Sequence, residues 1–234
     1  MVIRFVLLLL SAYLLGAVPA AYLAGKWARG IDIREYGSGN MGASNLLRLT
    51  SVGITIPVII FDLVKGMIPV WLARLLGLDI GLQVAIGLAA ICGHNWPVYL
   101  GFSGGRGLLT TLGVAFILPV INSLIPWEIV VFLAVAGILL FTIHDMALGT
   151  GLGAVFMPLV SWGFGEPLAM TLGFLAMLLL MIIRRLTAPK TTFPASVSRR
   201  ELLVNRLLFD RDIRDKEAWV NRQPLKQEEG KRKG

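Results

Sequence analysis

Apolar residues occur in long runs along residues 1–185, and short polar or glycine-rich stretches separate these runs. A helix needs about 20 predominantly apolar residues to cross a bilayer. The runs predict about seven membrane-spanning helices, or five or six if short runs merge or only dip into the membrane. The expected spans lie near 3–25, 51–73, 80–100, 107–125, 127–144, 147–164 and 166–183. This pattern predicts an all-α, polytopic membrane helical bundle.

The composition favours a membrane protein over two other classes. Only 15% of the residues are charged, 56% are hydrophobic and the mean hydropathy is +0.76. In an ordinary soluble domain about 25% are charged, and a disordered chain is poor in apolar residues. The single cysteine, Cys92, excludes an internal disulfide and a zinc site built from cysteines. The two histidines, His94 and His144, leave little for a metal cluster built from histidines.

Positive charge is concentrated in the last part of the chain. Residues 184–234 contain 14 Lys+Arg and 7 Asp+Glu, which account for +7 of the net charge of +8. We therefore expect a transmembrane domain at 1–185 and a basic cytoplasmic tail at 186–234, partly helical or disordered. Residues 198–222 predict one or two amphipathic helices, which either lie on the membrane surface or pack against the cytoplasmic face. Such a tail meets anionic lipid, and without a recognition module we expect no nucleic acid.

Basic residues in short loops predict the orientation, because cytoplasmic loops carry an excess of Lys and Arg. The loops at 26–50 and 101–106 and the tail hold most of them. With seven spans, these three regions share one side of the membrane. The N-terminus is then outside, and the C-terminus is cytoplasmic.

The densest group of polar residues lies in the stretch at 32–48. Gly37, Gly39 and Gly42 spell G-x-G-x-x-G, a weak dinucleotide signature here because no strand precedes it. Glycines nevertheless let backbone N–H groups approach a phosphate, and Arg48 adds a planar fork of donors. Hydroxyl and amide groups accompany them at Ser38, Asn40, Ser44 and Asn45. We interpret the stretch as an anion site; the alternative is a loop held by its own hydrogen bonds.

Asp62 and Lys65 form a second group. Three positions apart on a helix, they share one face. They are either a buried ion pair that keeps helices in register or a lysine aimed at an anion and held by the aspartate. The spacing alone does not choose between these two interpretations.

A third group follows the third apolar run. His94 and Pro97 come first, and Pro97 bends or ends the helix. Gly104-Gly105-Arg106-Gly107 then forms a flexible turn into the next helix, whose N-terminus favours anions. We interpret it as a second phosphate site, with a tight inter-helix turn as the alternative. The three groups together indicate a membrane protein that handles phosphorylated ligands at its cytoplasmic face, as a transferase, a transporter or a binding protein.

All three groups together resemble the bacterial acyl-phosphate:glycerol-3-phosphate acyltransferase family of integral membrane enzymes. The similarity covers roughly residues 10–185 and lies in Gly37-Ser-Gly-Asn-Met-Gly-Ala-Ser-Asn45 with Arg48, Asp62-x-x-Lys65-Gly66 and Gly93-His-x-x-Pro97…Phe102-x-Gly-Gly-Arg-Gly107. The resemblance implies transfer of a fatty acyl group from acyl phosphate to the 1-hydroxyl of glycerol 3-phosphate. The products are lysophosphatidate and phosphate, in phospholipid biosynthesis.

The resemblance also implies the surroundings and the site. We expect a multi-pass protein of the bacterial inner membrane, in contact with membrane lipids, with a cytoplasm-facing active site and neither coenzyme A, metal nor other cofactor. Catalytic roles are expected for Ser38, Asn40, Arg48 and Arg106. Substrate-binding roles are expected for Gly37, Gly39, Gly42, Asn45, Asp62, Lys65, His94, Gly104, Gly105, Gly107 and Arg184.

The chain departs from the family pattern in two loops and at the end of the last span. Ser103 and Arg106 stand where the family has two lysines, and Ser44 replaces a threonine. Arg184-Arg-Leu-Thr187 stands where the family has a His-Arg-x-Asn segment, so Arg184 or Arg185 is expected to take over a phosphate contact. The alternatives are a related acyltransferase with a different acceptor, or a non-catalytic paralogue or transporter of phosphorylated solutes. A transporter is expected to show repeated halves, and the sequence shows no repeat.

Overall fold

The computed structural model describes residues 2–188 and 197–220, and all regular secondary structure in these two ranges is helical. The all-α prediction is therefore confirmed for the described part of the chain. The helices are α1 (Val2–Gly16), α2 (Ala20–Arg29), α3 (Ala43–Leu49), α4 (Val52–Leu75), α5 (Ile80–Asn95), the 3-10 turn η1 (Val98–Leu100), α6 (Leu108–Ile121), α7 (Trp127–Ile143), α8 (Met146–Gly163), α9 (Leu168–Leu186), α10 (Arg199–Phe209) and α11 (Lys216–Val220).

Several of these helices are suited to a membrane. Four stretches of the described chain are long and apolar enough to cross one: Val2–Arg29, α4, α8 and α9. The helices α6 and α7 are apolar but shorter. Large apolar side chains such as Phe141 and Trp162 are exposed on the outside of the bundle, as expected for a surface that contacts lipid.

The first expected span contains two helices instead of one. α1 ends at Gly16 and α2 begins at Ala20, with Pro19 before it. Proline has no backbone N–H and disfavours helical geometry in the residue before it, which explains the interruption. The backbone carbonyl of Val18, left free by the break, accepts a 3.1 Å hydrogen bond from Nζ of Lys65 in α4. The break therefore gives Lys65 a partner on the first span.

Glycines set the distances between the helices that carry the polar groups. A side chain at Gly16 of α1 would collide with the backbone carbonyl of Ala90 in α5. A side chain at Gly113 of α6 would collide in the same way with the carbonyl of Leu63 in α4. Small residues at such contacts let helix backbones approach closely inside a membrane. These contacts set the spacing of α1 with α5 and of α4 with α6.

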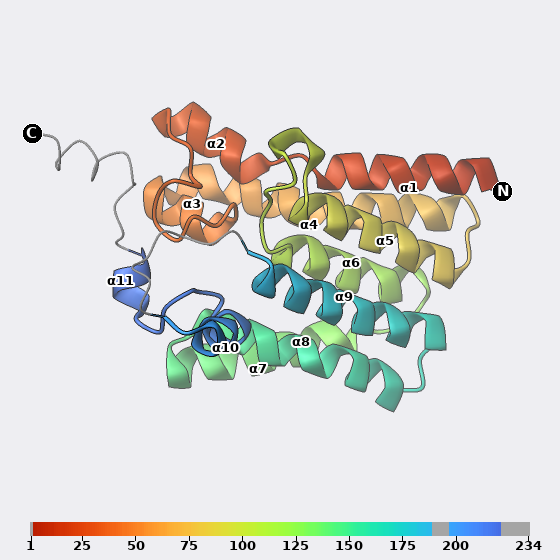
Figure 1. Cartoon of the computed structure of the whole chain (residues 1–234). Helices are drawn as coiled ribbons and strands as arrows, with labels where there is room; N and C mark the ends of the chain where they lie inside the picture. The colour runs from red at the N-terminus through yellow and green to blue at the C-terminus, as the bar shows by residue number, and fades with distance from the viewer. Residues whose placement is uncertain (1, 189–196, 221–234) are drawn as a thin grey trace, which may run out of the picture.

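One end of the bundle carries the short helices and the longer loops. α2, α3, α10 and α11 gather at the end opposite to the N-terminus (Figure 1). Residues 197–220, called the C-terminal segment below, pack against α8 and α9. Nη1 of Arg206 in α10 donates hydrogen bonds to the carbonyls of Leu186 and Ala188 at 3.0 and 2.8 Å. The tail helices were expected either to lie on the membrane surface or to pack against the bundle. In the structure, α10 packs against the bundle.

Candidate active site

A cavity of about 430 Å³ opens at this end of the bundle. Its walls come from the loop before α3, from α3 and α4, from the turn into α6, from the start of α8, from the end of α9 and from the C-terminal segment. The basic side chains in its wall are Arg48, Arg106, Arg185, Arg211 and Lys216. The apolar ones include Leu47, Ile59, Leu108, Leu109 and Met181. This lining suits a ligand with an anionic head and an apolar chain.

The loop before α3 is held in shape by Asn45, which is fully buried. Its Nδ2 donates to the carbonyls of Ile33 and Tyr36 at 2.9 and 3.1 Å, and its Oδ1 accepts from the backbone N–H of Ser38 at 3.0 Å. Gly37 has a φ of 56°, a left-handed conformation that favours glycine. The loop therefore is held by its own hydrogen bonds, as the alternative interpretation expected, and it also presents Ser38 to the cavity.

An ion pair fixes the start of the same loop. Nη2 of Arg34 lies 2.6 Å from Oδ2 of Asp32. Burial alone would raise the pKa of Asp32, but the hydrogen bonds and the charge of Arg34 outweigh it and hold this pKa below its ordinary value. Asp32 therefore stays ionised and paired near neutral pH.

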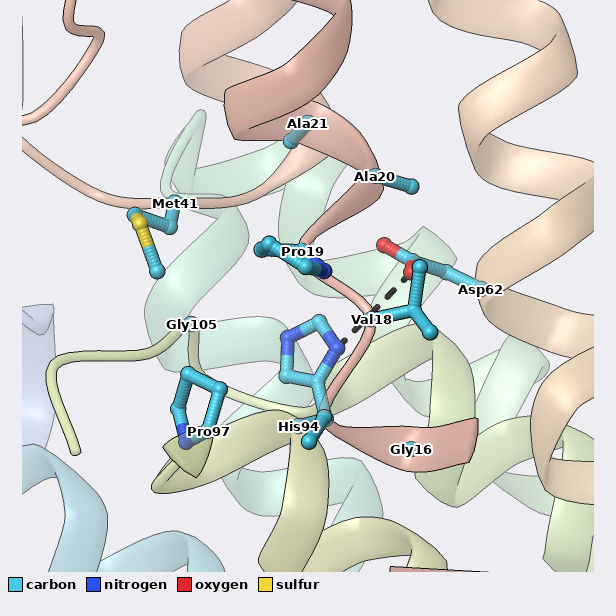
Figure 2. A pocket seen from close by; sticks show the side chains of 11 residues that line it. Gly16, Val18, Pro19, Ala20, Ala21, Met41, Asp62, His94, Pro97 and Gly105 are labelled. Atoms are coloured by element: carbon cyan, nitrogen blue, oxygen red, sulfur yellow. Dashed lines mark ion pairs between the residues drawn. The ribbon is translucent and has the colours of Figure 1, made fainter. Parts of the chain in front are cut away.

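Asp62 lines this cavity and also a small pocket beside the break between α1 and α2 (Figure 2). Its Oδ1 lies 2.7 Å from Nζ of Lys65 and 3.8 Å from Nδ1 of His94. Figure 2 shows the imidazole of His94 turned toward this carboxylate, next to Pro19. Lys65 is only 1% exposed and is bound to Asp62 and to the Val18 carbonyl. This geometry favours the buried ion pair that holds helices in register.

The glycine-rich turn into α6 is supported from α9. Arg184 donates from Nε to the carbonyl of Gly105 at 2.8 Å and from Nη2 to that of Gly104 at 2.5 Å. A side chain at Gly104 would collide with the carbonyl of His94, so the turn lies directly on the end of α5. Arg106 follows, and its Nε lies 2.5 Å from Oδ1 of Asp210 in the C-terminal segment. The turn is thereby tied to two distant parts of the chain.

The residues expected to form the site fall into two groups. Those that line the cavity are Ser38, Asn40, Gly42, Arg48, Asp62, His94, Arg106 and Gly107. Those outside its lining are Gly37, Gly39, Asn45, Lys65, Gly104, Gly105 and Arg184. Several of the second group support the walls, since Asn45 holds the first loop and Arg184 holds the turn into α6. Of the two arginines expected to take over a phosphate contact, Arg185 is the one that lines the cavity.

Sequence reasoning missed several charged residues of the cavity wall. Asp145 accepts hydrogen bonds from the first backbone N–H groups of α8 and from Nη2 of Arg211, at 2.8 Å for the latter. In the sequence it follows His144 and looks like part of a short interfacial loop. The others, Asp210, Arg211 and Lys216, belong to the C-terminal segment. Nothing in the local sequence of that segment indicates that it reaches the cavity.

Comparisons with known proteins agree on one family. A family model described as glycerol-3-phosphate acyltransferase matches residues 6–191. A protein named glycerol-3-phosphate acyltransferase 4, from Dehalococcoides mccartyi strain CBDB1, is 42% identical over 97% of this chain and 97% of its own length. One named glycerol-3-phosphate acyltransferase 5, from another strain of that species, is 40% identical over 96% of both chains.

Solved structures give the same result. The crystal structure of PlsY (YgiH), an integral membrane glycerol 3-phosphate acyltransferase in its glycerol 3-phosphate form, superposes with a TM-score of 0.72 and 30% identity. The match covers 91% of this chain and 96% of that one. The lysophosphatidic acid form of the same protein gives a TM-score of 0.69 and 28% identity, over 93% and 98% of the two chains.

Proposed function

The chain belongs to the glycerol-3-phosphate acyltransferase family, and from this premise we propose that it transfers a fatty acyl group from an acyl phosphate to the 1-hydroxyl of glycerol 3-phosphate. The products are lysophosphatidate and inorganic phosphate. One observation carries the proposal: a single cavity combines basic side chains from several parts of the chain with an apolar wall. Two phosphorylated substrates, one with a fatty chain, require such a combination.

The basic residues offset the repulsion between two anions that must come close together. We assign phosphate binding to Arg48 and Arg106, which come from α3 and the turn into α6. Arg185 of α9 adds positive charge to the same wall, while its terminal amino groups donate to the carbonyls of Leu207 and Ala147. Ser38 and Asn40 supply hydrogen bonds around the reacting groups. The apolar side chains of the same wall receive the start of the acyl chain.

The reaction itself asks for little acid catalysis. The 1-hydroxyl oxygen of glycerol 3-phosphate forms a bond to the carbonyl carbon of the acyl phosphate, and the bond from that carbon to the phosphate oxygen breaks. Phosphate leaves with the electron pair and is a good leaving group. The hydroxyl proton passes to a phosphate oxygen of a substrate, so no protein base is required. Positioning and electrostatic stabilisation are the contributions of the protein.

The proposal includes an orientation in the bacterial inner membrane. The chain spans it seven times, through α1 with α2 and through each of α4 to α9, with the N-terminus outside and the C-terminus in the cytoplasm. Support comes from the basic loops at 26–50 and 101–106, because cytoplasmic loops are rich in Lys and Arg. Residues 1–185 then form the transmembrane domain and 186–234 the cytoplasmic tail, a division supported by the end of the family match at residue 191.

The experiment that tests the function is direct. The purified protein in lipid receives palmitoyl phosphate and glycerol 3-phosphate, and both phosphate release and lysophosphatidate are followed. Product that requires both substrates is expected. Glycerol in place of glycerol 3-phosphate is the control, and it should give no acylated product. No product from folded protein would overturn the proposal and point to another acceptor or to a paralogue without this chemistry.

A further inference from the structure

The C-terminal segment is anchored to the bundle at several points around the cavity. Nη1 of Arg185 donates to the carbonyl of Leu207 at 2.8 Å. Nη2 of Arg211 lies 2.8 Å from Oδ2 of Asp145, and Nζ of Lys216 donates to the carbonyl of His144 at 3.0 Å. The family model ends before this segment, at residue 191. Similarity to the D. mccartyi relative extends over 97% of the chain, and therefore beyond that point.

Asp210 occupies a distinctive position in the segment. It ends α10 with a φ of 52°, and its backbone N–H donates to the carbonyl of Arg206. A non-glycine residue in this left-handed region is uncommon, although aspartate tolerates it better than most residues. The turn places the Asp210 carboxylate against Nε of Arg106, on a loop 104 residues earlier in the chain.

The contact leaves most of the Arg106 guanidinium available. Within residues 2–188 and 197–220, the side chain of Arg106 makes its hydrogen bond through Nε, and neither terminal amino group has a partner. Arginine has five N–H donors in a rigid fork. A carboxylate on Nε therefore fixes the direction of the fork and leaves the two amino groups for a phosphate. Asp210 need not move away when a substrate binds.

The positive charges around the turn into α6 also favour a positioning role for Asp210. The charge of Arg106 acts on two other arginines, Arg184 and Arg185, and both are buried. Their positive charges repel one another, which favours a displaced Arg106 side chain when no counter-ion is present. The Asp210 carboxylate, itself largely buried, supplies that counter-ion beside the cavity.

We propose that the C-terminal segment forms part of the active-site wall and contributes to catalysis. Within it, Asp210 is a positioning residue that holds Arg106 toward the substrate phosphate. The proposal rests on the proposed function, because it takes Arg106 as a phosphate-binding residue of acyl transfer. It extends the site beyond the part of the chain that the family model matches. The opposite case is an autoinhibitory contact, in which Asp210 competes with phosphate for Arg106. Removal of the Asp210 carboxylate would then raise kcat/KM and lower KM.

The first test is Asp210→Ala, with kcat and KM measured for both substrates. We expect kcat/KM to fall about tenfold to a hundredfold, with a raised KM for one phosphorylated substrate. Asp210→Asn keeps an acceptor oxygen but loses the charge, so it should lie between the wild type and Asp210→Ala. A kcat/KM equal to or above the wild type in Asp210→Ala would overturn the proposal.

A double-mutant cycle separates positioning from a general structural role. If Asp210 acts through Arg106, Asp210→Ala causes no further loss in an Arg106→Ala background. Independent losses that multiply would contradict the proposal. Glu217→Ala removes an exposed carboxylate from the same segment and should leave kcat/KM unchanged. Asp212→Ala removes the 2.6 Å ion pair with Arg206 and should lower the Tm at least as much as Asp210→Ala, with a smaller loss in kcat/KM.

Binding of inorganic phosphate, measured by calorimetry in lipid, distinguishes failure of the inference from failure of the proposed function. If the wild type makes no lysophosphatidate, the proposed function fails, yet phosphate binding still reports on Arg106. Weaker phosphate binding in Asp210→Ala than in the wild type supports the positioning role. Unchanged or tighter binding would overturn it, whatever the wild type catalyses.

Discussion

Nε of Arg184 donates a 2.8 Å hydrogen bond to the backbone carbonyl of Gly105, 79 residues earlier in the chain. The arginine is 3% exposed, and its Nη2 holds the neighbouring carbonyl of Gly104. A charged donor on two adjacent carbonyls fixes the direction of the turn that carries Arg106. This chain therefore uses the first arginine of its last span to support the site, while the next one, Arg185, lines the cavity.

Substitution of Arg184 by alanine should damage both stability and activity. Two buried carbonyls lose their charged donor, which costs about 1.5–3 kcal/mol in the free energy of unfolding. The Tm in detergent should fall, and kcat should fall because Arg106 loses its fixed position. Arg184→Lys can reach one carbonyl and should recover part of both. An unchanged Tm with only a raised KM would mean that Arg184 binds substrate directly.

Arg48 differs from Arg184, because its charge does not support the structure of the described part of the chain. It is exposed on α3 and lines the cavity, and its guanidinium makes no hydrogen bond within the described part of the chain. Arg48→Ala should lower kcat/KM about a hundredfold or more, since a phosphate loses its charged donor, while the Tm stays near the wild-type value. Leu47→Ala, the adjacent lining residue, is the control for a change of shape. Full activity of Arg48→Ala would contradict the site assignment.

Arg106→Lys introduces the lysine that the family resemblance implies at this position. A lysine ammonium can still pair with Asp210 and attract a phosphate, although it loses the planar fork. We therefore expect activity to be retained or to rise in the assay with palmitoyl phosphate. Arg106→Gln has a similar length and no charge, and it should lose most of the activity. If Arg106→Lys is inactive while its Tm is normal, the site has come to depend on the fork itself.

Local sequence pattern was sufficient to predict the helices of the bundle. The polar stretches singled out Ser38, Arg48 and Arg106, which line one cavity; their catalytic roles stay predictions. The pattern did not place the break before Pro19, because the apolar run continues through it to Leu23.

The place of Asp210 and the separate roles of Arg184 and Arg185 depend on contacts that no short stretch of sequence encodes. Asp210 lies in a charged tail that alone predicts only an amphipathic helix, and its contact with Arg106 joins positions 104 apart. Arg184 and Arg185 are neighbours in the sequence, yet one faces the turn into α6 and the other faces the cavity. A helix has about 3.6 residues per turn, so consecutive side chains point about 100° apart and reach different neighbours.

The Asp62–Lys65 pair gives a prediction about folding. Lys65→Met leaves the Asp62 carboxylate buried without its 2.7 Å partner and removes the donor to the Val18 carbonyl. Loss of one member of a buried pair costs about 3–5 kcal/mol, so the Tm should fall sharply. The double variant Asp62→Asn/Lys65→Met has no unpaired charge and should recover much of the Tm. No recovery would show that the bond from Lys65 to Val18 matters more than the ion pair.

Close helix contacts give the last prediction, with a matched pair of glycines. Gly113→Ala in α6 pushes a methyl group into the carbonyl of Leu63 in α4, and such overpacking costs about 1–3 kcal/mol. Gly137→Ala in α7 meets no atom within 4 Å and should be neutral or raise stability by about 0.5–1 kcal/mol, because alanine favours helix. Thermal unfolding in one detergent measures both. Equal Tm values for the two variants would show that α4 and α6 separate at little cost, and that this contact does not set their spacing.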